Sequence, residues 1–236
     1  MIKTKKEKRE RLAKIIDTLR EIYPDAPCAL EYGGDPWRLL VMARLSAQCT
    51  DKRVNDVSRV LFAKYPTASD LANAEISEVE NIIRPCGLYR MKAVNIIDAS
   101  RIVVMQHGGI LPSDMESLLE LPGVGRKIAN LLIGDVFGGG AIVCDTHFMR
   151  ICARLGMYPE GLRDAERIEF IMRDLMDISE GSDFCHRIVI FGREICTARS
   201  PRCEACPIFE LCEARGSSLG ARQKFTEEKN GRKKAL

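Results

Sequence analysis

The sequence predicts an all-α protein built from about ten short helices. Apolar residues recur at helical spacing, as they do over 93–104 and 168–176. Glycines stand where helices commonly end, at Gly108 and Gly156. Alternating strand patterns with hairpin turns are absent from the sequence, and no internal repeat is evident. These observations weigh against β-rich and repeat architectures.

Helix starts can be placed by their capping residues. Asp35 and Pro36 supply an N-cap and a first-turn proline ahead of the apolar run 37–45. Two further helices are expected to start at serines that have a glutamate three residues later, as in a capping box. These pairs are Ser77 with Glu80 and Ser113 with Glu116. With 236 residues, the chain can hold one large domain or two smaller ones.

The segment LPGVGRK at 121–127 joins two predicted helices, over 113–120 and 126–136. We interpret it as a helix-hairpin-helix, because its glycines let the backbone turn tightly and approach another surface. The amides of Gly123, Val124 and Gly125 would then face outward at a helix N-terminus, which favours a phosphate. Such contacts hold a nucleic acid by its backbone without reading its sequence. An ordinary helix connection is the alternative, and the pattern favours DNA binding over it.

Two residues in and after this segment could do chemistry. Lys127 lies in the first turn of the second helix, where the helix dipole and Arg126 disfavour an ammonium and so favour a Schiff-base lysine. The alternative is a surface or phosphate-binding lysine, and the position of Lys127 alone favours this alternative over a nucleophile. Asp145 has the form of an N-cap for the helix that ends before Gly156. Its carboxylate could also stabilise a cationic sugar transition state.

Four cysteines crowd into residues 196–212 with the spacing C-x6-C-x2-C-x5-C. They are Cys196, Cys203, Cys206 and Cys212. The chain opens with charged residues and shows no apolar run of transmembrane length, so we expect a cytosolic protein with reduced thiols and no membrane partner. Four thiolates then suit a metal centre. One C-x2-C pair flanked by single cysteines favours a [4Fe-4S] cluster over structural zinc.

Charge is distributed unevenly, although the net charge is only +3. Residues 1–20 carry eight Lys or Arg against three Asp or Glu, and residues 213–236 carry seven against three. This pattern predicts a polyanionic partner that is met by one basic face. Solvated tails are the alternative, and we favour it for 218–236, which we expect to be a basic flexible tail.

These motifs together resemble the endonuclease III family of DNA glycosylases, within the helix-hairpin-helix superfamily. The resemblance runs from about residue 10 to residue 215, and also includes LSAQCTD at 45–51 and CGLYRMKA at 86–93. It implies two α-helical domains. One is a six-helix barrel with the helix-hairpin-helix, over 29–139. The other is an iron–sulfur cluster domain, which joins 1–28 to 140–217.

The resemblance also implies roles for individual residues. Lys127 would attack C1′ of the damaged nucleotide, and Asp145 would support the reaction. Gln48 would fill the gap left by the extruded base, and Leu88 would wedge near the opposite strand, because a stacked base must be flipped to be reached. Other DNA contacts would come from the hairpin and from the residue two positions after Asp145. These are Gly123, Val124, Gly125, Arg126 and His147.

The function implied is that of a bifunctional DNA N-glycosylase and AP lyase of base excision repair. It would remove oxidised pyrimidines from double-stranded DNA and cleave the strand 3′ to the abasic site by β-elimination. We expect a monomer that works in the bacterial cytosol or nucleoid. A pyrimidine-dimer or mismatch-specific glycosylase, a non-catalytic DNA-binding module and a zinc protein remain alternatives. Cys49 and Cys144 depart from the family pattern, and we interpret them as small hydrophobes rather than oxidation-sensitive thiols.

Overall fold

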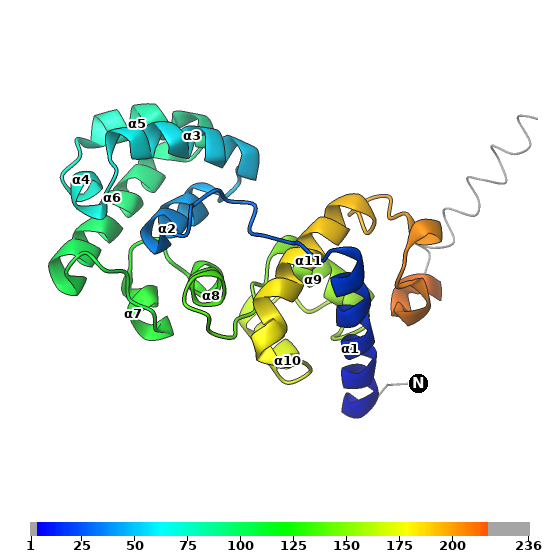
Figure 1. The fold of residues 1–236 in the computed structure, drawn as a ribbon. Coiled ribbons are helices and arrows are strands. Elements are labelled where there is room, and N and C mark those ends of the chain that lie inside the picture. Colours follow the sequence, from blue (N-terminus) through cyan, green and yellow to red (C-terminus); the bar gives the residue numbers. More distant parts are fainter. Residues whose placement is uncertain (1–3, 217–236) are drawn as a thin grey trace, which may run out of the picture. The chain divides into compact units, whose positions relative to one another are not determined.

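The computed structural model describes residues 4–216, and every regular element in that range is a helix (Figure 1). This confirms the predicted all-α class. The chain divides into two compact units. One is Cys28–Ala141, and the other joins the segment up to Pro27 with the segment that starts at Ile142. The basic tail expected at 218–236 lies outside the described residues.

The unit of residues 28–141 is organised around its longest helix. Its helices are α2 (Pro36–Leu45), α3 (Asp51–Lys64), α4 (Ala68–Ala72), α5 (Ile76–Ile83), the 3-10 turn η1 (Arg84–Cys86), α6 (Tyr89–His107), α7 (Met115–Glu120) and α8 (Arg126–Asp135). Helix α6 packs against α2, α4 and α5, while α8 packs against α2 and α7. Trp37 on α2 lies against Phe62 with ring centroids 5.4 Å apart, so α2 and α3 share the apolar core.

Helix α2 begins and α6 ends as the sequence predicts. The Asp35 carboxylate accepts hydrogen bonds from the amides of Trp37 at 2.9 Å and Arg38 at 3.2 Å, and Pro36 occupies the first turn. Gly108 ends α6 in the left-handed conformation, with φ +61°. A glycine serves here because it adopts that conformation without a steric cost from a β-carbon.

The two predicted capping boxes are wrong. Helix α5 follows Glu75, which makes no side-chain capping bond, so Ser77 lies inside the helix. Helix α7 follows Asp114, whose carboxylate accepts from the amide of Ser117 at 2.9 Å, one residue later than the expected Ser113. A carboxylate is a stronger acceptor than a hydroxyl, and it also interacts favourably with the positive end of the helix dipole.

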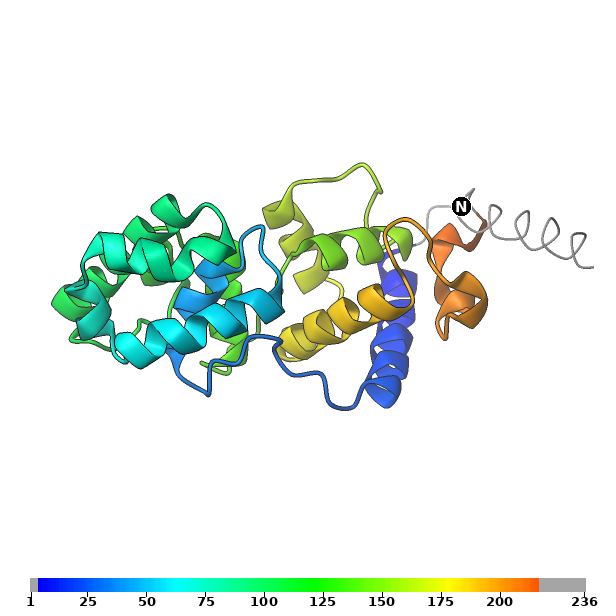
Figure 2. The ribbon, with the colours of Figure 1, turned by 90° about the horizontal axis from the view of Figure 1, so that it is seen from above.

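The second unit packs the N-terminal helix against the C-terminal half of the chain. Its helices are α1 (Lys5–Ile22), α9 (Thr146–Arg154), α10 (Ala165–Arg173) and α11 (Gly181–Glu194), followed by the 3-10 turns η3 (Cys203–Ala205), η4 (Phe209–Leu211) and η5 (Glu213–Gly216), with η2 (Ile178–Glu180) before α11. Helix α11 packs against both α1 and α9 (Figures 1 and 2). None of the described helices combines the length and apolarity that crossing a membrane requires.

Helices α9 and α11 approach closely because Gly192 has no side chain. A β-carbon there would lie 2.7 Å from Nδ1 of His147 and 2.8 Å from Cδ1 of Ile151. Phe148 on α9 meets Phe184 on α11 edge to face, with ring centroids 6.0 Å apart. The close packing therefore fixes the helix that begins after Asp145 against the helix that leads into the four cysteines.

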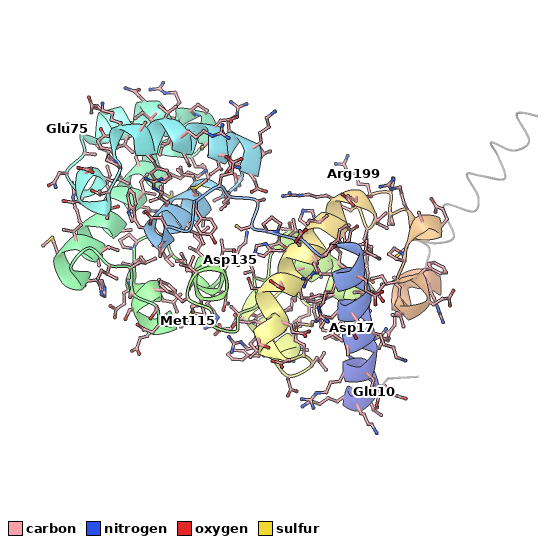
Figure 3. All side chains as sticks on the ribbon, viewed as in Figure 1. Glu10, Asp17, Glu75, Met115, Asp135 and Arg199 are labelled. Carbon is pink, nitrogen blue, oxygen red and sulfur yellow. The ribbon has the colours of Figure 1, made fainter. Side chains whose placement is uncertain are left out.

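The N-terminal basic residues are mostly engaged within their own unit. Lys5 and Arg9 pair with Asp174, at 2.5 Å and 3.6 Å. The buried Arg11 donates to the carbonyl of Leu211 at 3.1 Å. Acidic residues are interspersed along the exposed side of α1, where Figure 3 labels Glu10 and Asp17. The charge excess at 1–20 thus serves packing within this unit, and it does not by itself mark a DNA-binding face.

We predict that Asp114→Ala lowers the melting temperature measurably, while Ser113→Ala leaves it within experimental error. The alanine at Asp114 removes the acceptor that satisfies the Ser117 amide, whereas Ser113 makes no capping bond. Thermal unfolding of both variants at neutral pH and matched cluster content is the measurement. A larger loss for the Ser113 variant would restore the capping box that the sequence suggested.

Candidate nucleic-acid interface and metal centre

The turn between α7 and α8 is closed by its own backbone hydrogen bonds. The amide of Val124 donates to the carbonyl of Leu121 at 3.0 Å, and the Val124 side chain is buried. Val124 therefore stabilises the hairpin, and its amide is not available to a phosphate as the sequence suggested. Gly123 and Gly125 are exposed, and no acceptor for their amides lies among the described residues. The amides of the hairpin that can still donate to a phosphate are therefore those of the two glycines and of the first turn of α8.

A guanidinium lies directly behind the hairpin, which the sequence did not reveal. A β-carbon built on Gly123 would lie 2.5 Å from Nε of Arg44. With the Asn95 amide oriented so that its oxygen faces Arg44, that oxygen accepts from Nε at 2.9 Å and from Nη2 at 2.6 Å. Burial lowers the pKa of Arg44, yet an arginine stays charged at neutral pH. Arg44 thus adds positive charge behind the amides that face outward, and its only signal in sequence is an arginine within an apolar run.

Lys127 is exposed in the first turn of α8, two residues after Gly125. The opposite face of the helix is fixed in the core by Ala129, Asn130 and Leu132. Arg126, beside Lys127, is half-buried. The amine is therefore presented to solvent from a rigid helix start, immediately after the hairpin.

Gln48 and Leu88 are the only described residues other than glycine with a positive φ, at 55° and 47°. Both are exposed, and the Leu88 side chain retains 54% of its accessible surface. Such a conformation costs about 1–3 kcal/mol for a residue with a β-carbon and is concentrated at functional sites. The two residues expected to enter DNA thus share an uncommon backbone conformation within one unit.

Asp145 caps α9 as predicted, since its carboxylate accepts from the Phe148 amide at 2.7 Å. His147 lies in the first turn of the same helix, with Nδ1 3.2 Å from Nη2 of Arg150. Lys127 belongs to the unit of residues 28–141, and Asp145 belongs to the other unit.

The four cysteines expected to bind metal line a single cavity, together with apolar side chains and the arginines Arg154, Arg202 and Arg215. Burial raises the pKa of the Cys206 thiol to about 11, and it also raises the pKa of Cys203 and Cys212. Thiols in such surroundings become thiolates when a metal centre supplies compensating positive charge. The convergence of four soft donors on one cavity fits an iron–sulfur cluster held by Cys196, Cys203, Cys206 and Cys212.

Helix α9 holds the cysteine loop through two arginines one turn apart. Arg150 donates to the carbonyl of Cys196 at 3.0 Å. Arg154 donates to Sγ of Cys196 at 3.3 Å, to the carbonyl of Thr197 at 2.7 Å and to that of Ala198 at 2.8 Å. These contacts offset the negative charge of a thiolate-bound cluster. Neither arginine was expected from sequence, and their four-residue spacing on one helix is the signal that could have shown them.

The same loop carries two other arginines, Arg199 and Arg202. Arg202 hydrogen-bonds to the carbonyl of Glu194 at the end of α11. Arg199 is exposed in the turn after α11 (Figure 3). Cys49 and Cys144, which depart from the family pattern, are half-buried and pack against the apolar cores of their units, as small hydrophobes do.

We predict that Gly123→Ala lowers the melting temperature by about 2–12 °C, which corresponds to a loss of about 1–3 kcal/mol in a chain of this size. The alanine would require a φ of +77° and would force Arg44 away from the hairpin. Gly125→Ala is the matched control, because nothing lies within 4 Å of a β-carbon there and its φ is −108°. Equal melting temperatures for the two variants would contradict this account of the hairpin.

Two protein-family models match this chain, one over the helices around the hairpin and one over the four cysteines. Residues 41–177 match the family of HhH-GPD superfamily base excision DNA repair proteins. Residues 196–212 match the iron-sulfur binding domain of endonuclease III, which confirms the iron–sulfur expectation for the four cysteines. The match ends at the outermost members of the cysteine set, Cys196 and Cys212.

Similar chains are endonucleases III. That of Synechocystis sp. is 41% identical over 89% of this chain and 95% of its own, and that of Bacillus subtilis is 39% identical over 84% and 89%. An endonuclease III in a non-covalent DNA complex superposes with a TM-score of 0.84 and 36% identity, covering 92% of this chain and 98% of that one. An endonuclease III trapped in a covalent intermediate with DNA gives 0.82 and 38%, covering 87% and 96%. By these matches over most of its length, the chain belongs to the endonuclease III family of HhH-GPD base excision DNA repair proteins.

Proposed function

We propose that the protein is a bifunctional DNA glycosylase and AP lyase of base excision repair, which removes oxidised pyrimidines from double-stranded DNA as a monomer. The observation that carries this proposal is Lys127, an exposed amine in the first turn of α8 immediately after the hairpin. A relative 38% identical to this chain has been trapped in a covalent intermediate with DNA. As a DNA repair protein, it would work in the bacterial cytosol, at the nucleoid.

Lys127 is the proposed nucleophile. Its neutral amine forms a bond to C1′ of the damaged nucleotide while the N-glycosidic bond breaks, and the base leaves with that electron pair and takes up a proton. Opening of the sugar ring converts the adduct to an iminium. The iminium acidifies the C2′ proton, whose loss expels the 3′ phosphate in β-elimination. Water then hydrolyses the Schiff base and restores the amine.

Asp145 is the proposed electrostatic partner of this reaction. As the N-cap of α9, its carboxylate accepts from the Phe148 amide at 2.7 Å, which fixes the side chain at the start of that helix. A fixed anion stabilises the positive charge that develops on the sugar as the base departs. The same side chain would thus serve both the local folding of α9 and the chemistry.

Gln48 and Leu88 are the proposed inserting residues, and the hairpin is the proposed backbone contact. Extrusion of a base costs a few kcal/mol, which side chains that occupy the vacated space offset. An exposed leucine in a left-handed loop suits a wedge, and an exposed glutamine suits pairing with an orphaned base. Gly123, Gly125 and Arg126 would bind phosphate, and His147 would contact DNA near Asp145. When bound, the iron–sulfur cluster supplies four iron–thiolate bonds that fix the loop after α11.

We predict that Lys127→Ala abolishes the covalent adduct that the wild-type protein forms with abasic-site DNA under borohydride reduction. The alanine removes the only atom proposed to bond to C1′, so no iminium is available for reduction. Denaturing electrophoresis of the trapped complex measures this. Lys14→Ala, at an exposed position on α1, is the control and should be trapped like wild type. A wild-type protein that yields no adduct would contradict the enzymatic function and favour a non-catalytic DNA-binding module.

We predict that Asp145→Asn lowers kcat by about 100-fold, the cost typical of losing one preorganised electrostatic group. Its melting temperature should change little, because asparagine caps a helix about as well as aspartate. The control is Asp164→Asn at the start of α10, where the carboxylate likewise accepts a backbone bond, from Arg167 at 3.0 Å. The measurement is the rate of single-turnover cleavage by both variants. A fully active Asp145→Asn protein would show that this residue only caps α9.

A further inference from the structure

The Lys92 side chain is fully buried. Its Nζ donates to three backbone carbonyls, those of Leu45 at 2.8 Å, Ala47 at 2.8 Å and Cys86 at 2.9 Å. An ammonium has three donors, so donors and acceptors match in number. A neutral amine would direct its lone pair at one carbonyl oxygen, and burial by itself lowers the pKa of Lys92. The three carbonyls are therefore the groups that hold the charged form.

The three carbonyls belong to two separate segments of the chain, each of which leads into a loop. Leu45 is the last residue of α2, and Ala47 directly precedes Gln48. Cys86 is the last residue of η1, two positions before Leu88. The backbone amide of Lys92 also donates to the carbonyl of Leu88, at 3.1 Å. One residue on α6 thus hydrogen-bonds to both loops that carry the proposed inserting side chains.

These are also the loops in which the backbone is strained. Gln48 and Leu88 alone among the described residues with a β-carbon have a positive φ. Strained conformations persist only where surrounding contacts over-determine them. The side-chain bonds of Lys92 fix the backbone immediately before Gln48 and two residues before Leu88. Without them, three carbonyls beside the strained residues would lose the buried partner they share.

We propose that Lys92 is a positioning residue whose ammonium presets the two loops, so that Gln48 and Leu88 enter the duplex together. The proposal rests on the proposed function, and it assigns a role to a residue that touches no substrate. Because the loops are already ordered in the folded protein, the entropy cost of ordering them does not weaken DNA binding or base extrusion. The effect should thus be confined to duplex substrates, in which side chains must be inserted into the helix at the lesion.

The test compares cleavage of an abasic site in a duplex with cleavage of the same oligonucleotide as a single strand, which needs no insertion. For Lys92→Met we expect the duplex-to-single-strand rate ratio to fall about tenfold, as for the loss of one buried hydrogen-bond partner. Val103→Ala is the control, a buried residue on the same helix about 16 Å along its axis. It should lower the melting temperature and preserve the ratio. Lys92→Gln, which keeps two donors, replaces the methionine variant if that protein does not fold.

A double-mutant cycle separates positioning from a merely structural role. In a Leu88→Ala background the wedge is already absent, so Lys92→Met should lower the ratio by much less than its tenfold effect in wild type. A ratio that stays at the wild-type value in Lys92→Met, or an effect that is the same in both backgrounds, would overturn the proposal. Failure of the proposed function is distinct, because the wild-type protein would then cleave neither substrate.

Discussion

Within each of the two units, long cationic side chains hydrogen-bond to loop carbonyls and so fix irregular backbone. Carbonyls beyond a helix end have no partner within the helix, and a buried one must find a partner elsewhere. Lys92 does this for the loops around Gln48 and Leu88, Arg154 does it for the cysteine loop, and Arg11 does it for the carbonyl of Leu211. Each side chain contributes several donors from one stem, so a single residue can fix several points of irregular backbone. The functional loops are fixed by this means.

The hairpin shows the complementary arrangement, in which donors rather than acceptors remain for a ligand. Its turn satisfies the amide of Val124 internally, and it leaves the exposed glycines and the start of α8 facing outward. Arg44 and Asn95 occupy the space behind Gly123, so the turn has positive charge on its inner side. Any larger residue at Gly123 would displace this pair. The glycine thus serves both the left-handed backbone and the close approach of the guanidinium.

Much of the fold and part of the site were predictable because their determinants are local. Asp35 and Asp145 cap helices through bonds to residues two or three positions away. The capping box at Ser113 failed because the neighbouring Asp114 is a better acceptor, whereas α5 begins after Glu75 with no side-chain capping bond. The charge excess at 1–20 suggested a DNA-binding face, yet Asp174 pairs with Lys5 and Arg9 from more than 160 residues away. Charge counted along a sequence does not report such pairs.

The sequence by itself determined the all-α class, the hairpin, the spacing of the four cysteines and the cap at Asp145. Each of these depends on residues within a few turns of one another, where spacing fixes geometry. Only the tertiary structure decided which amides of the hairpin remain outward, which arginines hold the cysteine loop and what Lys92 does. The partners of Lys92 on α2 and in the loop that follows it lie 47 and 45 residues away in the chain. Hydrogen bonds over such separations depend on how helices pack, which no local pattern of residues encodes.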